Sequence, residues 1–171
     1  MMGRQHLMSG VVTGSLVAAA THLPPDQVVI FIPLVGVCAL LPDMDHPDAM
    51  LPRMLSWPGR ATAAIISHVF GHRTLTHSVL GVSLLAAGLV FIPGLPLWAA
   101  GAVLLGCLTH IAGDMLTQSG VPIWWPHRAI WRLTPRRFAF RTGSRVEQLV
   151  LSPLLAIAAA ASVGLVVATS A

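Results

Sequence analysis

The sequence predicts an all-α integral membrane protein, a polytopic helical bundle with about five transmembrane helices and a short helix at the membrane surface. Hydrophobic residues make up 55% of the 171 residues and charged residues only 9%, whereas charged residues are about 25% of typical soluble domains. The mean hydropathy is +0.77. This composition excludes an ordinary soluble domain and a disordered chain, and residues 1–171 have the length of a single domain.

Five apolar runs supply the expected membrane spans. They cover residues 7–23, 25–41, 77–92, 97–116 and 146–169. Pro25 fits the first turn of a helix and Pro33 kinks the interior of the second span. The first run could also be a signal peptide, but further spans follow it, so we interpret it as a span. Between the second and third runs, residues 61–70 predict a short amphipathic helix lying on the membrane surface.

The distribution of arginine predicts the orientation. All ten basic residues are arginine. If the N-terminus is cytoplasmic, five spans place all ten on the cytoplasmic side, and the outer turns, residues 23–26 and 93–96, contain none. The positive-inside rule therefore predicts a cytoplasmic N-terminus and an external C-terminus.

The histidines and aspartates that this topology places on the cytoplasmic face are candidate metal ligands. They are His6, Asp43, Asp45, His72, His77, His110 and Asp114. Ionisable groups at a membrane core are costly, so each marks a candidate site. His110 and Asp114 are four residues apart, on one face of a helix, and imidazole and carboxylate both bind zinc. We expect a divalent metal, with zinc the first expectation, manganese or iron as alternatives, and one to three ions.

Each of these residues also has an ordinary interpretation. A single histidine at a membrane interface usually contacts headgroups, and Asp-x-Asp after Leu-Pro is often a cap or turn. The convergence of seven candidates on one face favours the metal site. Hydroxyl groups of Thr74, Thr76, Thr109 or Ser78 are expected to support the ligands, and Glu147 is interpreted as a carboxylate at a helix N-terminus.

The loop at residues 117–145 alternates aromatic and basic residues from Trp124 to Arg132. We interpret it as a surface that contacts lipid headgroups, because spans tether it to the bilayer on both sides. Stacking and charge would also suit nucleic acid, which we do not expect as a partner; membrane lipids are the expected partners. Cys38 and Cys107 lie in apolar runs and are interpreted as packing residues.

The order and spacing of these residues resemble a known family. The pattern is His6, then Pro42-Asp43-x-Asp45, then His72-Arg73-x-x-Thr76-His77-Ser78, then His110-x-x-x-Asp114-x-x-Thr117-x-x-Gly120, then Trp125-Pro126. Over residues 3–126 it resembles the YdjM-like family of inner-membrane, metal-dependent hydrolases. That family is more distantly similar to the zinc-dependent phospholipase C and P1 nuclease group. The resemblance implies a multi-pass protein of the bacterial inner membrane that hydrolyses phosphate esters.

On this basis the expected activity is hydrolysis of a lipid phosphate ester at the cytoplasmic membrane face. A bound metal lowers the pKa of its water to about 7. Asp45 and Asp114 are the expected catalytic carboxylates, and Arg73 is expected to neutralise charge that develops on phosphate. The alternative is a non-enzymatic metal-binding membrane protein, such as a metal transporter or sensor. Transport sites usually lie near the bilayer midplane, whereas these residues lie at the ends of the spans.

Overall fold

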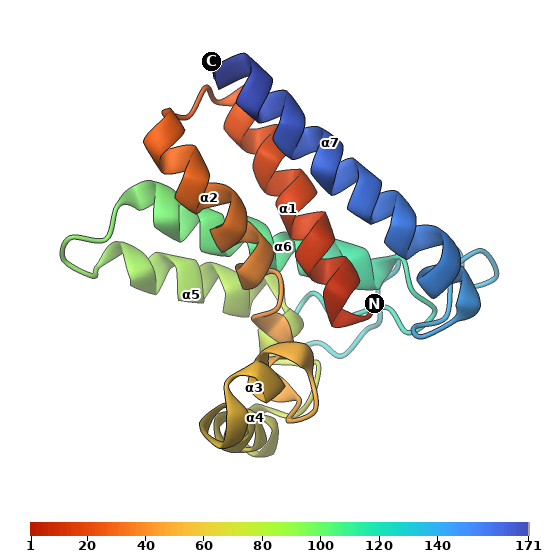
Figure 1. The fold of residues 1–171 in the computed structure, drawn as a ribbon. Helices are drawn as coiled ribbons and strands as arrows, with labels where there is room; N and C mark the ends of the chain where they lie inside the picture. Colours follow the sequence, from red (N-terminus) through yellow and green to blue (C-terminus); the bar gives the residue numbers. More distant parts are fainter. Residues whose placement is uncertain (171) are drawn as a thin grey trace.

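The computed structural model describes residues 1–170, with side chains through residue 168, and its regular elements are helices (Figure 1). Its longer helices in the bundle are α1 (Gly3–Ala20), α2 (Pro25–Cys38), α5 (Val79–Val90), α6 (Leu97–Met115) and α7 (Ser152–Ser170). Within residues 1–170 there is no strand, and the loop at residues 117–145 forms only isolated bridges. The predicted all-α class is confirmed.

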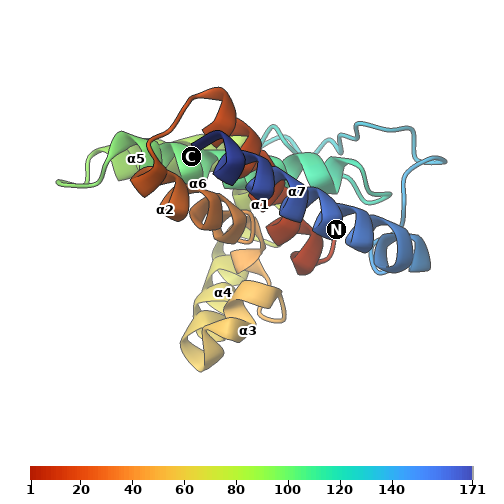
Figure 2. The same ribbon diagram turned by 45° about the horizontal axis from the view of Figure 1, so that its top comes forward.

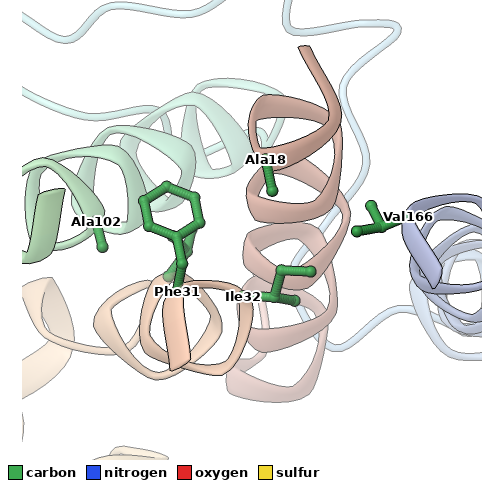
Figure 3. Packing of buried hydrophobic residues seen from close by; sticks show 6 residues of the cluster. Ala18, Phe31, Ile32, Ala102 and Val166 are labelled. Carbon is green, nitrogen blue, oxygen red and sulfur yellow. The ribbon is translucent and has the colours of Figure 1, made fainter. Parts of the chain in front are cut away.

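Helix α1 is the central element of the bundle. Helices α2 and α7 run alongside it, α6 crosses behind α1 and α2, and α5 packs on α6 (Figures 1 and 2). Side chains from four helices meet in a common core that includes Ala18, Phe31, Ile32, Ala102 and Val166 (Figure 3). Cys38 and Cys107 are free and buried, as their packing interpretation predicts.

Glycine permits the close approach of α6 to α2. A Cβ atom on Gly106 would lie 2.6 Å from the carbonyl oxygen of Val35 and 2.8 Å from the amide nitrogen of Ala39. Small residues commonly let helix backbones approach closely inside membranes. The last turn of α2 is therefore pressed against the middle of α6, and this contact positions the backbone of Ala39 for the site described below.

Three segments of the described chain are long and apolar enough to cross a membrane: Pro25–Asp45, Leu97–Met115 and Glu147–Ala168. Helix α1 is not among them, because its first turn carries Arg4, Gln5 and His6. Helix α5 has only 12 residues. The helical membrane bundle is supported, whereas five complete crossings remain a prediction.

Helix boundaries differ from the apolar runs because hydrogen bonds rather than hydropathy determine them. Helix α1 begins at Gly3, so His6 lies in its first turns rather than before the helix. Helix α5 begins at Val79. The preceding residue, Ser78, caps it, because its side chain accepts a 3.0 Å hydrogen bond from the Gly81 amide. A π-helical turn, Glu147–Leu151, precedes α7.

A hairpin of α3 (Met50–Met54) and α4 (Ser56–Phe70) projects from one end of the bundle (Figures 1 and 2). The predicted surface helix at residues 61–70 is the second part of α4. The helix starts earlier because Pro58 fits its first turn and Gly59 is buried where α3 packs against it. Trp57, Ile65 and Val69 are exposed on α4, as expected for a helix on a membrane surface.

Candidate metal centre

Four segments that are distant in the sequence meet at one end of the bundle. They are the first turns of α1, the 3-10 turn Pro42–Asp45, the 3-10 turn Leu75–His77 and the last turns of α6. The residues of the pattern that this brings into one cluster are His6, Asp43, His77, His110 and Asp114. Four of the five are fully buried, and the Asp43 side chain is 19% exposed.

Two potential metal groups, each of three donors, share His110 in this cluster. One consists of His77, His110 and Asp114, the other of His6, Asp43 and His110, and the donor atoms within each group lie within 4.8 Å of one another. The Nε2 atoms of His77 and His110 lie 3.2 Å apart. Oδ1 of Asp43 lies 3.5 Å and 3.7 Å from these two nitrogens, and Oδ2 of Asp114 lies 4.0 Å and 3.9 Å from them. Ligands of a tetrahedral zinc ion, each about 2.0–2.2 Å from the metal, are separated by about 3.3–3.6 Å. The described groups could therefore hold a metal ion.

The proton on His110 can be placed from its backbone contact. Nδ1 of His110 lies 2.7 Å from the carbonyl oxygen of Ala39. A carbonyl oxygen only accepts hydrogen bonds, so Nδ1 carries the proton and Nε2 of the neutral ring has a free lone pair. Metal-binding histidines usually have this arrangement, in which the other ring nitrogen donates to a carbonyl or carboxylate.

The proton on His77 can be placed in the same way. The hydroxyl of Thr76 donates to Oδ2 of Asp45 over 2.6 Å, and Nδ1 of His77 lies 3.0 Å from that hydroxyl oxygen. Because the hydroxyl proton is already donated to the carboxylate, Nδ1 of His77 is the donor to Thr76. The Nε2 lone pair of neutral His77 then faces that of His110.

Two facing lone pairs repel each other unless a cation or a proton lies between them. Burial opposes a charge on His77, but the carboxylates of Asp43 and Asp45 outweigh burial and raise the pKa of His77 above its ordinary value. Without a metal, a proton on His77 relieves the repulsion. A divalent cation at the same point relieves it more completely, since the two carboxylates offset its charge.

His6 extends the cluster on the side of Asp114. Its ring stacks on that of His110 with centroids 3.6 Å apart and an interplanar angle of 13°. Nε2 of His6 lies 3.2 Å from Oδ1 of Asp114, yet neither ring nitrogen has a hydrogen-bond partner in the described residues. A buried imidazole without a partner is costly, and a metal ligand role would remove that cost.

Asp45 and His72 lie outside both potential metal groups. Oδ1 of Asp45 lies 2.8 Å from Nδ1 of His72, and its Oδ2 accepts hydrogen bonds from the Arg73 amide over 2.7 Å and from Thr76. His72 is 42% exposed. These contacts favour a role for Asp45 in holding the loop at residues 71–77 beside the cluster, rather than the ligand and catalytic roles predicted from its spacing.

Arg73 connects this loop to the cluster. Its guanidinium donates to Oδ2 of Asp114 over 2.8 Å, where the amino group of Met1 also contacts the carboxylate. The backbone of Arg73 has a positive φ of 55°, a conformation that costs a non-glycine residue about 1–3 kcal/mol. Hydrogen bonds from both its backbone and its side chain hold it there, which supports a functional role for this side chain.

Among the predicted supporting hydroxyl groups, Thr76 is the one that contacts the candidate ligands. Thr109 instead donates to the carbonyl of Leu105, Ser78 caps α5, and Thr74 donates to the carbonyl of Gly71. Sequence reasoning missed the carbonyl of Ala39, because a backbone atom leaves no sequence signal. 

Sequence reasoning also assigned too simple a role to Glu147. This carboxylate stands at the start of its π-helical turn, as predicted, but it is fully buried. It accepts hydrogen bonds from the amides of Met2 and Gly143, each over 2.6 Å. Glu147 therefore ties the segment before α1 to the loop before α7.

A family model and curated relatives point to the same protein family. The family model for the YdjM inner membrane protein matches residues 1–170. The inner membrane protein YdjM of Escherichia coli (strain K12) is 37% identical over 127 residues, and so is that of Shigella flexneri. These matches cover 72% of this chain and 62% of each relative's length. The chain therefore accounts for less than two thirds of those relatives.

A second kind of relative matches over nearly its full length. A Bacillus subtilis (strain 168) protein named uncharacterized protein YvsG is 32% identical over 155 residues, which covers 90% of this chain and 89% of that protein. No solved structure matches the chain. The family match over residues 1–170, together with helices able to cross a membrane, shows that this chain belongs to the YdjM family of inner membrane proteins.

Proposed function

We propose that this protein is a membrane-bound, metal-dependent hydrolase that cleaves a phosphate ester of a lipid. The observation that carries the proposal is the pair of buried imidazole nitrogens, Nε2 of His77 and of His110, which face each other at 3.2 Å between two carboxylates. Such a donor set has the composition of a zinc, manganese or iron site.

His77, His110 and Asp114 would hold one ion. His6 and Asp43 form the other group with His110 and would provide ligands toward a second ion. A metal in such a site supplies a water molecule that is deprotonated near neutral pH and an electrophile that polarises phosphoryl oxygens. The ligands come from several segments that pack against one another, and this packing keeps the arrangement rigid before a substrate binds.

Arg73 would act on the phosphate. Its guanidinium is fixed on Asp114 beside the cluster, and its side chain is 27% exposed, so it faces both the carboxylate and the outside. A fixed cation at this position would stabilise negative charge that develops on phosphoryl oxygens. Asp114 would orient Arg73 as well as bind metal, and Asp45 would position the loop that carries Arg73.

The surroundings of the cluster favour a lipid substrate. The cluster lies at the ends of segments that are long enough to cross a membrane, where headgroups would lie in the bilayer. Exposed apolar side chains of α4 and of the 117–145 loop, among them Trp57, Trp124 and Trp131, flank this end of the bundle. Aromatic side chains of this kind concentrate at the membrane interface. We place this end at the cytoplasmic face, from the arginine distribution.

The test is an assay of phospholipid hydrolysis with the purified full chain in detergent. The protein is stripped with a chelator and reloaded with zinc, manganese or iron, and released diacylglycerol or headgroup is measured by mass spectrometry. We expect turnover that requires metal, is lost in Asp114→Ala and falls at least tenfold in Arg73→Gln. His22→Ala, at the opposite end of α1, serves as the control that retains turnover.

Two results would count against the proposal. Turnover that survives in Asp114→Ala would show a contaminating hydrolase. Stoichiometric metal without hydrolysis of any phospholipid assayed would favour the non-enzymatic alternative, a metal transporter or sensor.

A further inference from the structure

A cavity of about 480 Å³ lies beside the metal centre, between the loop that follows α4 and the loop that follows α6. Its lining includes Phe70, His72, Arg73, Ser119, Arg128 and Ile130. Two of these side chains reach directly to buried carboxylates, because His72 contacts Asp45 and Arg73 contacts Asp114, each over 2.8 Å. The Arg73 side chain therefore joins the lining of this cavity to a carboxylate of the cluster.

The cavity has a positive lining. Arg73 and Arg128 both line it, and none of its lining residues is acidic. Nε of Arg73 is buried without a hydrogen-bond partner in the described chain. The Arg73 side chain as a whole is 27% exposed, so a ligand with acceptor oxygens can reach it from the cavity. Two arginines across a cavity suit a phosphate, which accepts several hydrogen bonds from guanidinium groups.

The position of Arg128 is supported by its loop. The amide of Val121 donates to the carbonyl of Trp131 over 3.1 Å, and the amide of Trp131 donates to Val121 over 2.8 Å. Gly120 makes this pairing possible, because its φ is +62° and a Cβ atom there would lie 2.5 Å from the Trp131 carbonyl oxygen. The pairing holds the segment that contains Arg128 against the segment that contains Ser119.

The cavity also has an apolar side. Phe70 and Ile130 line it, and their side chains are 46% and 48% exposed. They come from the end of α4 and from the 117–145 loop, the two elements whose apolar side chains face outward at this end of the bundle. A ligand with a phosphate and an attached apolar chain would match both parts of the lining.

We propose that this cavity is the substrate site, that it binds the phosphate ester of a lipid, and that Arg128 is the residue that selects for the phosphate. This inference rests on the proposed function and extends it to a substrate class. Arg73 contacts the phosphate at the inner end beside the metal cluster, and Arg128 contacts it at the outer end. Phe70 and Ile130 contact the first part of the apolar chain.

The test measures binding rather than turnover. Native mass spectrometry of the full chain in detergent compares dioleoyl phosphatidic acid with dioleoylglycerol, which lacks the phosphate, and glycerol 3-phosphate is added as a soluble competitor. Arg128→Gln should bind phosphatidic acid about tenfold more weakly, the effect of losing one charge-assisted hydrogen bond, with dioleoylglycerol binding and metal content unchanged. Arg136→Gln removes the same charge from the same loop outside the cavity and should bind as the wild type does.

Equal losses in Arg128→Gln and Arg136→Gln would overturn the proposal, because the effect would then be general surface charge. Arg128-dependent binding of glycerol 3-phosphate without binding of phosphatidic acid would overturn the lipid assignment. The measurement is repeated on chelator-treated protein. If the wild type proves to hold no metal while Arg128-dependent binding of phosphatidic acid persists, the hydrolase proposal fails and the cavity assignment stands.

Discussion

The Nε2 atoms of His77 and His110 lie 3.2 Å apart inside the protein, and each ring is anchored through its opposite nitrogen. The carbonyl of Ala39 anchors His110, and the hydroxyl of Thr76 anchors His77. Both anchors direct a lone pair into the cluster, where Oδ1 of Asp43 lies 3.5 Å from Nε2 of His77 and Oδ2 of Asp114 lies 3.9 Å from Nε2 of His110. A rigid set of converging donors is the arrangement that favours a bound cation over water or a loose hydrogen-bond network.

The anchoring of His77 predicts a strong effect when a methyl group replaces the neighbouring hydroxyl of Thr76. Thr76→Val removes the hydroxyl that joins Nδ1 of His77 to Asp45 while nearly keeping the side-chain volume. We expect metal affinity to fall about ten- to hundredfold, as for other partners of metal-binding histidines. Competition with a fluorescent zinc chelator measures the affinity.

Thr109→Val is the matched control, since the Thr109 hydroxyl donates within its own helix, to Leu105, over 2.8 Å. It should leave the affinity unchanged. An equal loss in both variants would show that the effect comes from general stability rather than from the contact with His77.

The two aspartates of the Pro42–Asp45 turn should behave differently when each is changed to asparagine. Asp43 faces the two imidazole nitrogens, whereas Asp45 binds His72, Arg73 and Thr76. We expect Asp43→Asn to lower the number of metal ions bound per chain. Asp45→Asn should keep that number and weaken affinity, with faster hydrogen exchange at residues 71–77. Loss of stoichiometry in Asp45→Asn would restore Asp45 as a ligand.

The contact between α6 and α2 predicts opposite effects for two glycine-to-alanine changes on one helix. A methyl group on Gly106 meets the backbone of Val35 and Ala39. A methyl group on Gly101 would have no described atom within 4 Å apart from its chain neighbours and the backbone of its own helix. Gly106→Ala should destabilise the protein by about 1–3 kcal/mol through overpacking. Gly101→Ala should be neutral or stabilise it by up to about 1 kcal/mol. Thermal unfolding in detergent measures both, and comparable midpoints would contradict this packing.

Sequence reasoning anticipated the meeting of His6, Asp43, His77, His110 and Asp114, because hydropathy and arginine distribution predict which segment ends share a face. It did not separate Asp43 from Asp45. Spacing shows that they are close, but the 3-10 turn decides where each points, and that turn is specified by contacts with residues 71–77. Hydropathy also missed the first part of α4, where Pro58 and Gly59 suggest a loop although α3 buries Gly59.

The membrane orientation predicted from arginine can be tested with reporters on the full chain. A reporter fused to the C-terminus should be accessible from outside the inner membrane. One inserted at Ser56, at the junction of α3 and α4, should be accessible from the cytoplasm. The reverse pattern would place the candidate metal centre on the outer face and contradict the orientation.

The most direct test of the central claim is the metal content of the purified full chain, measured by elemental mass spectrometry beside a His110→Ala/Asp114→Ala double variant and His22→Ala. The geometry predicts at least one zinc, manganese or iron ion per chain in the wild type and in His22→Ala. It predicts none in the double variant. A wild type that holds no more metal than the double variant, even after reloading, would contradict the metal centre, and the cluster would then be a network of buried hydrogen bonds.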